Sequence, residues 1–177
     1  NSRNIACCIS GTRRFTLFPP EQISNLYAGP LEFTMAGPPA SMVDFHNPDY
    51  GLYPKFRDAE AAALTADLEP GDAIYIPSLW WHHVEANGPL NMLANYWWMP
   101  KGAGPAFEAV LLALMTMRDQ PAPEKRAWRS FFEHYVFSEK AGHVADHLPK
   151  KWQTVTGAKT PGRDEFILSF ILRQFAK

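Results

Sequence analysis

The sequence predicts a mainly β domain followed by a helical C-terminal region. Residues up to about 100 are rich in strand formers and turn signals, whereas residues from about 105 onward carry apolar side chains at helical spacing. The run EPGDAIYIPSLWWHHV at 69–84, with NYWW at 95–98, predicts a turn, a strand, a second turn carrying tryptophans and a histidine, and another strand. That order is typical of a small β-barrel with an imidazole at its mouth. We therefore expect a barrel domain over 1–100 and a helical region over 101–177.

Strand and turn signals divide the first part into short elements. We expect strands, in chain order, at 6–10, 13–18, 67–68, 73–76 and 90–98. Short helices are expected at 19–26, which proline opens, and at 56–63. The segment between them, 27–54, is rich in Pro and Gly, and a long irregular segment in a compact domain is typically a functional loop.

In the second part, the spacing of apolar residues predicts three helices, at 105–117, 123–137 and 163–177. In the last of them, Phe166, Phe170 and Ile171 lie beside Ile167 and Leu168, so the apolar surface is too wide for one neighbour. Such terminal helices commonly pair across a symmetric interface. We expect a homodimer formed through this region.

Composition restricts the class of protein. With 46% hydrophobic and 14% aromatic residues in 177, the chain is long and apolar enough for a globular core. A net charge of -1 without any basic run argues against a nucleic-acid partner. The chain has no apolar run of membrane-spanning length, and its first residues lack the pattern of a secretory signal. We expect a cytoplasmic protein that binds neither nucleic acid nor membrane.

Three sequence blocks carry a family resemblance. They are NIACCISGTRRFTLFPP at 4–20, VDFHNPDY at 43–50 and the region 69–98, in this order. Together they resemble the distal half of the iron site in the Jumonji-C/cupin-like dioxygenases, most closely the bacterial members related to the asparaginyl hydroxylase that inhibits hypoxia-inducible factor. The resemblance implies a double-stranded β-helix, or jelly roll, with Fe(II) and 2-oxoglutarate as cofactors. It also implies hydroxylation of a protein side chain or another small polar substrate.

One departure from the family pattern leaves two interpretations open. In the family, His-x-Asp and a distant His hold the iron and leave coordination positions for 2-oxoglutarate and oxygen. By resemblance, that Asp would fall immediately before Asn1. Either the sequence is the distal part of a longer oxygenase, or the polypeptide is a non-enzymatic cupin-like scaffold for binding or dimerisation.

His82 is the candidate metal ligand. It follows Trp80 and Trp81, whose bulk would exclude water, and neutral imidazole is a common ligand of divalent iron. The resemblance identifies His82 as the distant iron ligand, whereas without it a hydrogen-bonded histidine at the barrel rim would be favoured. His83 points to the opposite face of an extended segment, so we expect it to be structural or at the surface.

Arg13 is a candidate for co-substrate binding. On an extended strand it shares a face with Phe15 and Leu17, so its guanidinium enters an apolar environment and needs an anionic partner. The resemblance implies that this partner is the terminal carboxylate of 2-oxoglutarate, although a lysine usually occupies the position in the most similar branch. The alternative is an internal pair with an Asp or Glu.

Two asparagines complete the candidate site. Asn95 shares its face with Leu93 and Trp97, and Asn4 has the parity of Ala6. By resemblance, both amides would bind the co-substrate carboxylates or order the metal ligands. The alternative is that they satisfy buried backbone groups.

The segment Asp44-Phe45-His46 also places a carboxylate and a histidine close together in sequence, as a reversed counterpart of His-x-Asp. Asn47 and Pro48 follow it, and this context predicts a turn in which Asp44 caps backbone groups. We therefore expect a turn here and treat metal binding as the minor alternative.

Overall fold

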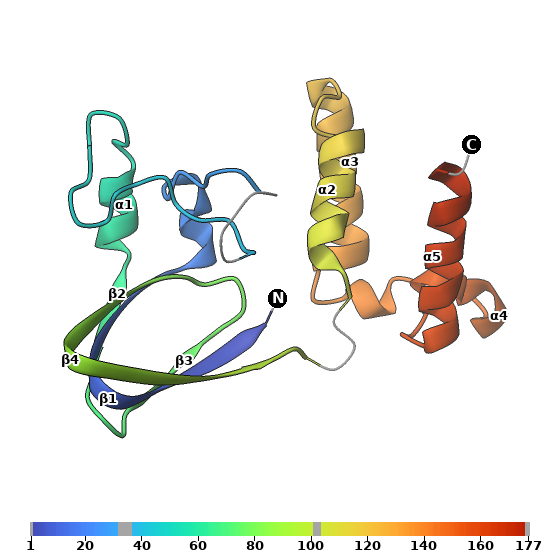
Figure 1. Cartoon of the computed structure of the whole chain (residues 1–177). Coiled ribbons are helices and arrows are strands. Elements are labelled where there is room, and N and C mark those ends of the chain that lie inside the picture. The colour runs from blue at the N-terminus through green and yellow to red at the C-terminus, as the bar shows by residue number, and fades with distance from the viewer. Residues whose placement is uncertain (1, 32–36, 101–103, 176–177) are drawn as a thin grey trace. The chain divides into compact units, whose positions relative to one another are not determined.

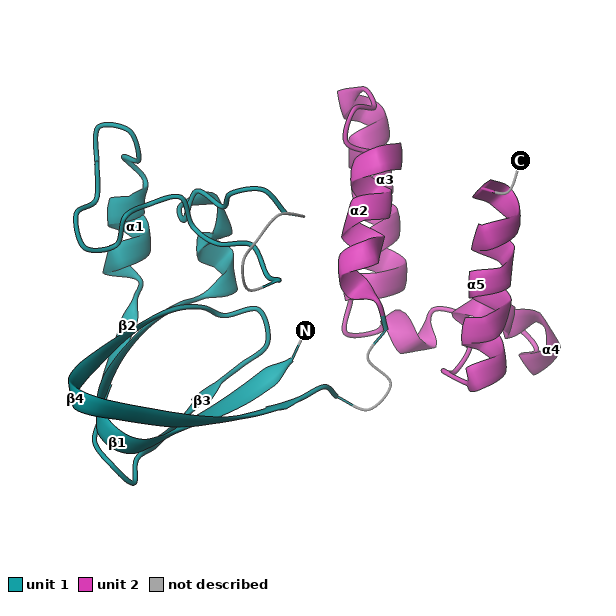
Figure 2. Cartoon of the chain, viewed as in Figure 1, with its two compact units in different colours: residues 1–104 teal, residues 105–177 magenta. Residues whose placement is uncertain are grey.

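The structure is a computed structural model and describes residues 2–31, 37–100 and 104–175. The chain divides into two compact units, Asn1–Gly104 and Pro105–Lys177 (Figure 2). The first unit is an antiparallel sheet with short helices, and the second is helical. This is the fold class expected from the sequence.

Strand β1 (Arg3–Phe18) is the centre of a four-stranded antiparallel sheet (Figure 1). Strand β4 (Trp81–Trp98) pairs with β1 from end to end. Along the other side of β1, β2 (Leu64–Leu68) pairs with its second half and β3 (Ala73–Ile76) with its first half. The pairing holds β1 and β4 in a fixed register, which positions the candidate residues.

Gly11 forms a bulge within β1, whereas the sequence predicted two separate strands on either side of it. The φ of Gly11 is +71°, in the left-handed region, and the register with β4 shifts between Cys8 and Thr12. A side chain at this position would collide with the Asn91 side chain and come within 2.9 Å of the Leu90 carbonyl oxygen. The strand continues because β4 pairs with it on both sides of the bulge.

The bulge changes which residues of β1 share a face. Even-numbered side chains before Gly11 and odd-numbered side chains after it belong to one buried cluster. We call this side of the sheet the inner face. Its core consists of Ala6, Cys8, Phe15, Leu17, Leu68 and Ile76.

Strand β4 is longer than the predicted strand 90–98. The second predicted turn is present at Ser78 and Leu79, but it ends before His82, which was expected within it. Residues 81–84 pair with Phe18 through Phe15 of β1, so His82 lies in a strand. The register with β1 jumps from Asn87 to Met92, across a stretch that contains Gly88 and Pro89. Proline has no N–H for the sheet and is tolerated at such bulges, so β4 keeps its pairing on both sides.

The opposite, outer face is covered near the end of β1 by a second core. The residues of this core are Phe18, Leu26, Val43, Phe56 and Ala59. They come from β1, from the chain that follows the 3-10 helix η1 (Pro20–Ser24), and from helix α1 (Phe56–Ala61). Between these helices, the described residues of 27–54 form no helix, and Tyr27 and Phe45 pack against this core.

The helical unit begins with α2 (Ala106–Thr116) and α3 (Ala122–Phe132), and a π-helical turn (Glu133–Phe137) continues α3. The short helices Ala141–His143, α4 (Lys150–Gln153) and Thr154–Thr156 follow, and α5 (Pro161–Phe175) is the last. Among the described residues of this unit, Ala145 is the one buried apolar side chain. The large side chains of α5 stay about half exposed, for example Phe166 at 52% and Phe170 at 51%.

No helix in the described part of the chain combines the length and the apolar character needed to cross a bilayer.

Candidate functional site

The inner face brings together the four residues that the sequence singled out. In the β1–β4 ladder, Leu17 lies opposite His82 and Ala6 lies opposite Asn95. Directly opposed residues in an antiparallel pair project to the same side of the sheet. His82 and Asn95 therefore lie on the face of Leu17 and Ala6, and Arg13 and Asn4 share that face by their positions in β1.

The two asparagines contact each other across the strands. Asn4 Nδ2 donates a hydrogen bond of 3.2 Å to Asn95 Oδ1. Asn4 Oδ1 is buried and has no hydrogen-bond partner among the described residues. An unpartnered buried acceptor costs about 1–3 kcal/mol. The pair therefore has hydrogen-bonding capacity that the described residues do not use.

Arg13 and Arg14 have opposite environments although they are adjacent. Arg14 lies on the outer face, where its Nε and Nη2 donate to Asp67 at 2.7 and 3.0 Å. This hydrogen-bonded pair lowers the pKa of the Asp67 carboxyl from its usual value. Arg13 Nε is buried and has no hydrogen-bond partner among the described residues. A buried N–H donor without an acceptor is costly, so this position suits a ligand carboxylate.

His82 is exposed on the inner face. Ala86, which lies opposite Arg13, is on the same face of β4, two alternate positions further along the strand. Its Nδ1 is 3.4 Å from the Trp80 carbonyl oxygen. When Nδ1 carries the proton for that contact, Nε2 has a free lone pair for a metal. Trp80, whose carbonyl oxygen makes this contact, packs its side chain against the inner-face core.

The inner face fits the family's cofactors in part. It presents an imidazole, a guanidinium with a buried and unpartnered Nε, and a pair of amides, which are the groups that bind a metal and a dicarboxylate. Among the described residues, His82 belongs to no group of three potential metal ligands. A three-ligand iron centre on this face therefore needs donors in addition to those described.

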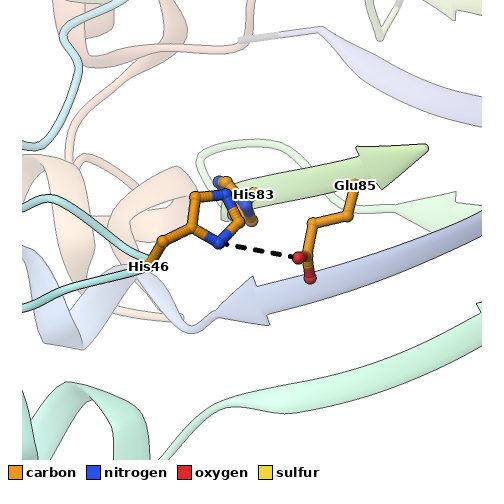
Figure 3. A group of neighbouring side chains, drawn as sticks. All are labelled: His46, His83 and Glu85. Carbon is orange, nitrogen blue, oxygen red and sulfur yellow. Dashed lines mark ion pairs between the residues drawn. The ribbon is translucent and has the colours of Figure 1, made fainter. Parts of the chain in front are cut away.

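A second cluster lies on the outer face. Single donor atoms of His46, His83 and Glu85 all lie within 4.8 Å of one another (Figure 3). His83 and Glu85 come from alternate positions of β4, and His46 comes from the loop between η1 and α1. His46 Nδ1 is 3.8 Å from Glu85 Oε1.

The turn predicted at Asp44 is present and positions His46. Asp44 Oδ1 accepts hydrogen bonds from the backbone N–H groups of His46, at 3.0 Å, and Asn47, at 3.3 Å. Sequence reasoning placed His83 on the face opposite His82, which is where it lies, but it did not connect His83 to His46. The spacing His83-x-Glu85 could have indicated a shared site, because alternate residues of a strand project to the same face.

His83 is the most enclosed member of this cluster. Its ring stacks on Phe45, with the ring centroids 4.0 Å apart and the planes at 23°. Its Nε2 is buried and has no hydrogen-bond partner in the described part of the chain. Burial lowers the pKa of His83 from 6.5, Glu85 opposes that shift, and nearby His46 adds to it. The environment of His83 thus favours the neutral form of its imidazole.

Comparisons with known proteins assign the first unit to a family. Residues 1–104 match the family described as the cupin-like domain. HSPB1-associated protein 1 of Homo sapiens is 34% identical over 94 residues, which cover 53% of this chain and 19% of that protein. Lysine-specific demethylase JMJ31 of Arabidopsis thaliana is 30% identical over 95 residues, covering 54% of this chain and 17% of that protein.

A third relative has a different named role. The tRNA wybutosine-synthesizing protein 5 of Danio rerio is 34% identical over 83 residues, covering 47% of this chain and 23% of that protein. The aligned regions thus span less than a quarter of the length of each of these relatives.

Proposed function

Because the chain belongs to the cupin-like domain family, we propose that its first unit is the distal part of the catalytic domain of an Fe(II)- and 2-oxoglutarate-dependent oxygenase. Relatives named as a lysine-specific demethylase and as a Jumonji C domain-containing protein support the oxygenase family. The observation that carries the proposal is the arrangement of the inner face. Arg13 Nε is buried there without a partner among the described residues, on the face that also presents His82 and the Asn4–Asn95 pair.

Each residue of the inner face has a role in this proposal. His82 holds the iron through a neutral imidazole, and its Nδ1 contact with the Trp80 carbonyl oxygen orients the ring. By family resemblance, the other two iron ligands belong to a His-x-Asp segment that would precede Asn1 in the intact protein. When bound, iron with 2-oxoglutarate and oxygen supplies the oxidising chemistry of hydroxylation.

Arg13 binds the terminal carboxylate of 2-oxoglutarate through charge-assisted hydrogen bonds. The Asn4–Asn95 pair orients the co-substrate, because its bond uses the Asn95 oxygen as acceptor and leaves the Asn95 nitrogen as a donor. Relative to the lysine usual in the most similar branch, the longer planar guanidinium at Arg13 favours a two-point contact. The proposed substrate is a protein side chain or another small polar molecule.

The second candidate function is a non-enzymatic cupin-like scaffold. The observation that favours it is the single imidazole on the inner face of the described residues. One histidine holds a divalent ion poorly, and a fold alone does not establish an activity.

An anaerobic titration separates these two functions. The intact protein is titrated with Fe(II) and 2-oxoglutarate while the visible charge-transfer band of the chelate is followed. We expect a band in the intact protein and its loss in the His82→Ala variant, with the His147→Ala variant as the control because His147 is an exposed residue of the helical unit. Absence of the band from the intact protein would overturn the oxygenase proposal in favour of the scaffold.

We also propose that the helical unit forms a homodimer. Its described residues bury one apolar side chain, Ala145, while α5 exposes Phe166, Leu168, Phe170 and Leu172 around its surface. Apolar area of this extent is stabilised by contact with a protein surface. A second copy of the same helix would cover this apolar area in a symmetric interface.

A further inference from the structure

We propose that His46, His83 and Glu85 form a second metal site, on the outer face of the sheet, for a divalent transition ion of the zinc class. Two imidazoles and one carboxylate are a donor set that binds Zn²⁺ with positions left for water. The site is separate from the inner face, because His83 and His82 project to opposite sides of β4. It therefore does not depend on the proposed oxygenase function.

Only a small movement of the side chains would bring the three donor atoms to the separations found around a zinc ion. Donor atoms around a tetrahedral zinc ion lie roughly 3.4 Å apart. His46 Nδ1 and Glu85 Oε1 are 3.8 Å apart, and all three donors lie within 4.8 Å. The His46 side chain is 67% exposed, so its ring is free to turn toward the other two donors (Figure 3).

The backbone supports each donor. His83 and Glu85 are fixed by the pairing of β4 with Thr16 and Arg14 of β1. His46 is fixed by the turn in which Asp44 Oδ1 accepts the His46 N–H group. Donors on a paired strand and a capped turn are pre-organised, which lowers the entropic cost of binding an ion.

The ring of His83 is oriented and lacks a polar partner. Phe45 stacks on it at 4.0 Å, and Phe45 in turn contacts Phe18 edge-on, which ties the ring plane to the outer-face core. His83 Nε2 is buried without a partner among the described residues. Coordination through that nitrogen would offset the cost of leaving it desolvated.

Glu85 is available to an ion although Arg14 lies opposite it in the ladder. The Arg14 guanidinium is already engaged by both carboxylate oxygens of Asp67, at 2.7 and 3.0 Å. No described residue other than His46 forms an ion pair with Glu85. The carboxylate thus faces the two imidazoles.

A hollow of about 280 Å³ lies on the Glu85 side of the cluster, with Phe45 and Arg14 also among the lining residues. Water would occupy the remaining coordination positions of the ion.

The test is a Zn²⁺ titration of the full 177-residue chain by calorimetry and equilibrium dialysis. We expect one ion per chain, with affinity reduced more than about tenfold in His46→Gln and in Glu85→Gln, because loss of an outer-shell partner alone costs about 10–100-fold. The His82→Ala and His147→Gln variants serve as matched controls and should bind as the parent chain does. The visible spectrum with Co²⁺ should report nitrogen and oxygen donors in the parent chain and change in His46→Gln.

Three results would overturn the proposal. They are no binding by the parent chain, unchanged affinity in both His46→Gln and Glu85→Gln, and loss of binding in His82→Ala, which would place the ion on the inner face. Circular dichroism checks that each variant is folded, and His46→Gln changes only an exposed loop side chain. Zn²⁺ should also raise the melting temperature of the parent chain and of His82→Ala, but not that of His46→Gln.

Discussion

His82 and His83 are consecutive residues of β4 whose side chains lie on opposite faces of the sheet, each in a different one of the two proposed sites. His82 lies opposite Leu17 on the inner face, and His83 lies opposite Thr16 on the outer face, where it stacks on Phe45. The alternation of a paired strand enforces this separation. A substitution at one of these histidines therefore changes one site and leaves the donors of the other in place.

Arg13→Ala should weaken the binding of 2-oxoglutarate to the iron-loaded intact protein. Loss of a charge-assisted hydrogen bond costs about 1.5–3 kcal/mol, which corresponds to a loss of affinity of roughly ten- to a hundredfold. Anaerobic calorimetry measures this affinity. Arg14→Ala is the matched control, because Arg14 is the neighbouring arginine on the outer face and pairs with Asp67. Equal affinity in Arg13→Ala and the parent would remove Arg13 from the co-substrate site.

Gly11→Ala should destabilise the sheet more than Gly71→Ala does. Both glycines have positive φ, +71° and +103°, so alanine is strained at either position by about 1–3 kcal/mol. Only at Gly11 would the added Cβ also collide, because the Asn91 side chain lies against it, whereas nothing lies within 4 Å at Gly71. Urea denaturation compares the two free energies of unfolding. Similar losses of unfolding free energy in the two variants would show that the bulge accommodates the added methyl group without further cost.

Asp67→Asn should remove a small stabilisation that depends on pH and salt. The Arg14 hydrogen bond lowers the pKa of Asp67 in the folded chain from 3.8, so the pair stabilises the fold fully above that pH. The contribution is lost as pH falls through the lowered pKa. At neutral pH, the free energy of unfolding measured by denaturation should therefore be lower for the variant than for the parent. At strongly acidic pH or in about 1 M salt, the two free energies should become similar. A difference that persists in acid would assign the effect to packing instead.

The face of each candidate residue was largely predictable from strand parity. Arg13 was assigned to the side of Phe15 and Leu17, and Asn95 to the side of Leu93, and both lie on those faces. Parity alone does not relate Asn4 to Arg13, because one position is even and the other odd. Their common face depends on the bulge at Gly11, whose existence follows from the pairing with β4.

Contacts between distant segments could not be predicted in the same way. The turn at Asp44 was predicted from local sequence because an Asx turn is a local structure. The approach of His46 to His83 depends on how the segment 27–54 folds over the outer face, and no local pattern encodes that path. The expected position of His82 within a turn was wrong for a related reason, since the ladder with β1 extends β4 to Trp81.

Phe170→Glu should convert the proposed dimer into a monomer. Phe170 lies in α5 with 51% of its surface exposed, among other apolar side chains of the same helix, so a charge there would be buried unpaired in a symmetric interface. Ser169→Glu introduces the same charge one position earlier, at another exposed residue of the helix, and is the matched control. Light scattering of the parent and both variants measures the mass. A monomeric parent would exclude the dimer, and a dimeric Phe170→Glu variant would place the interface away from this residue.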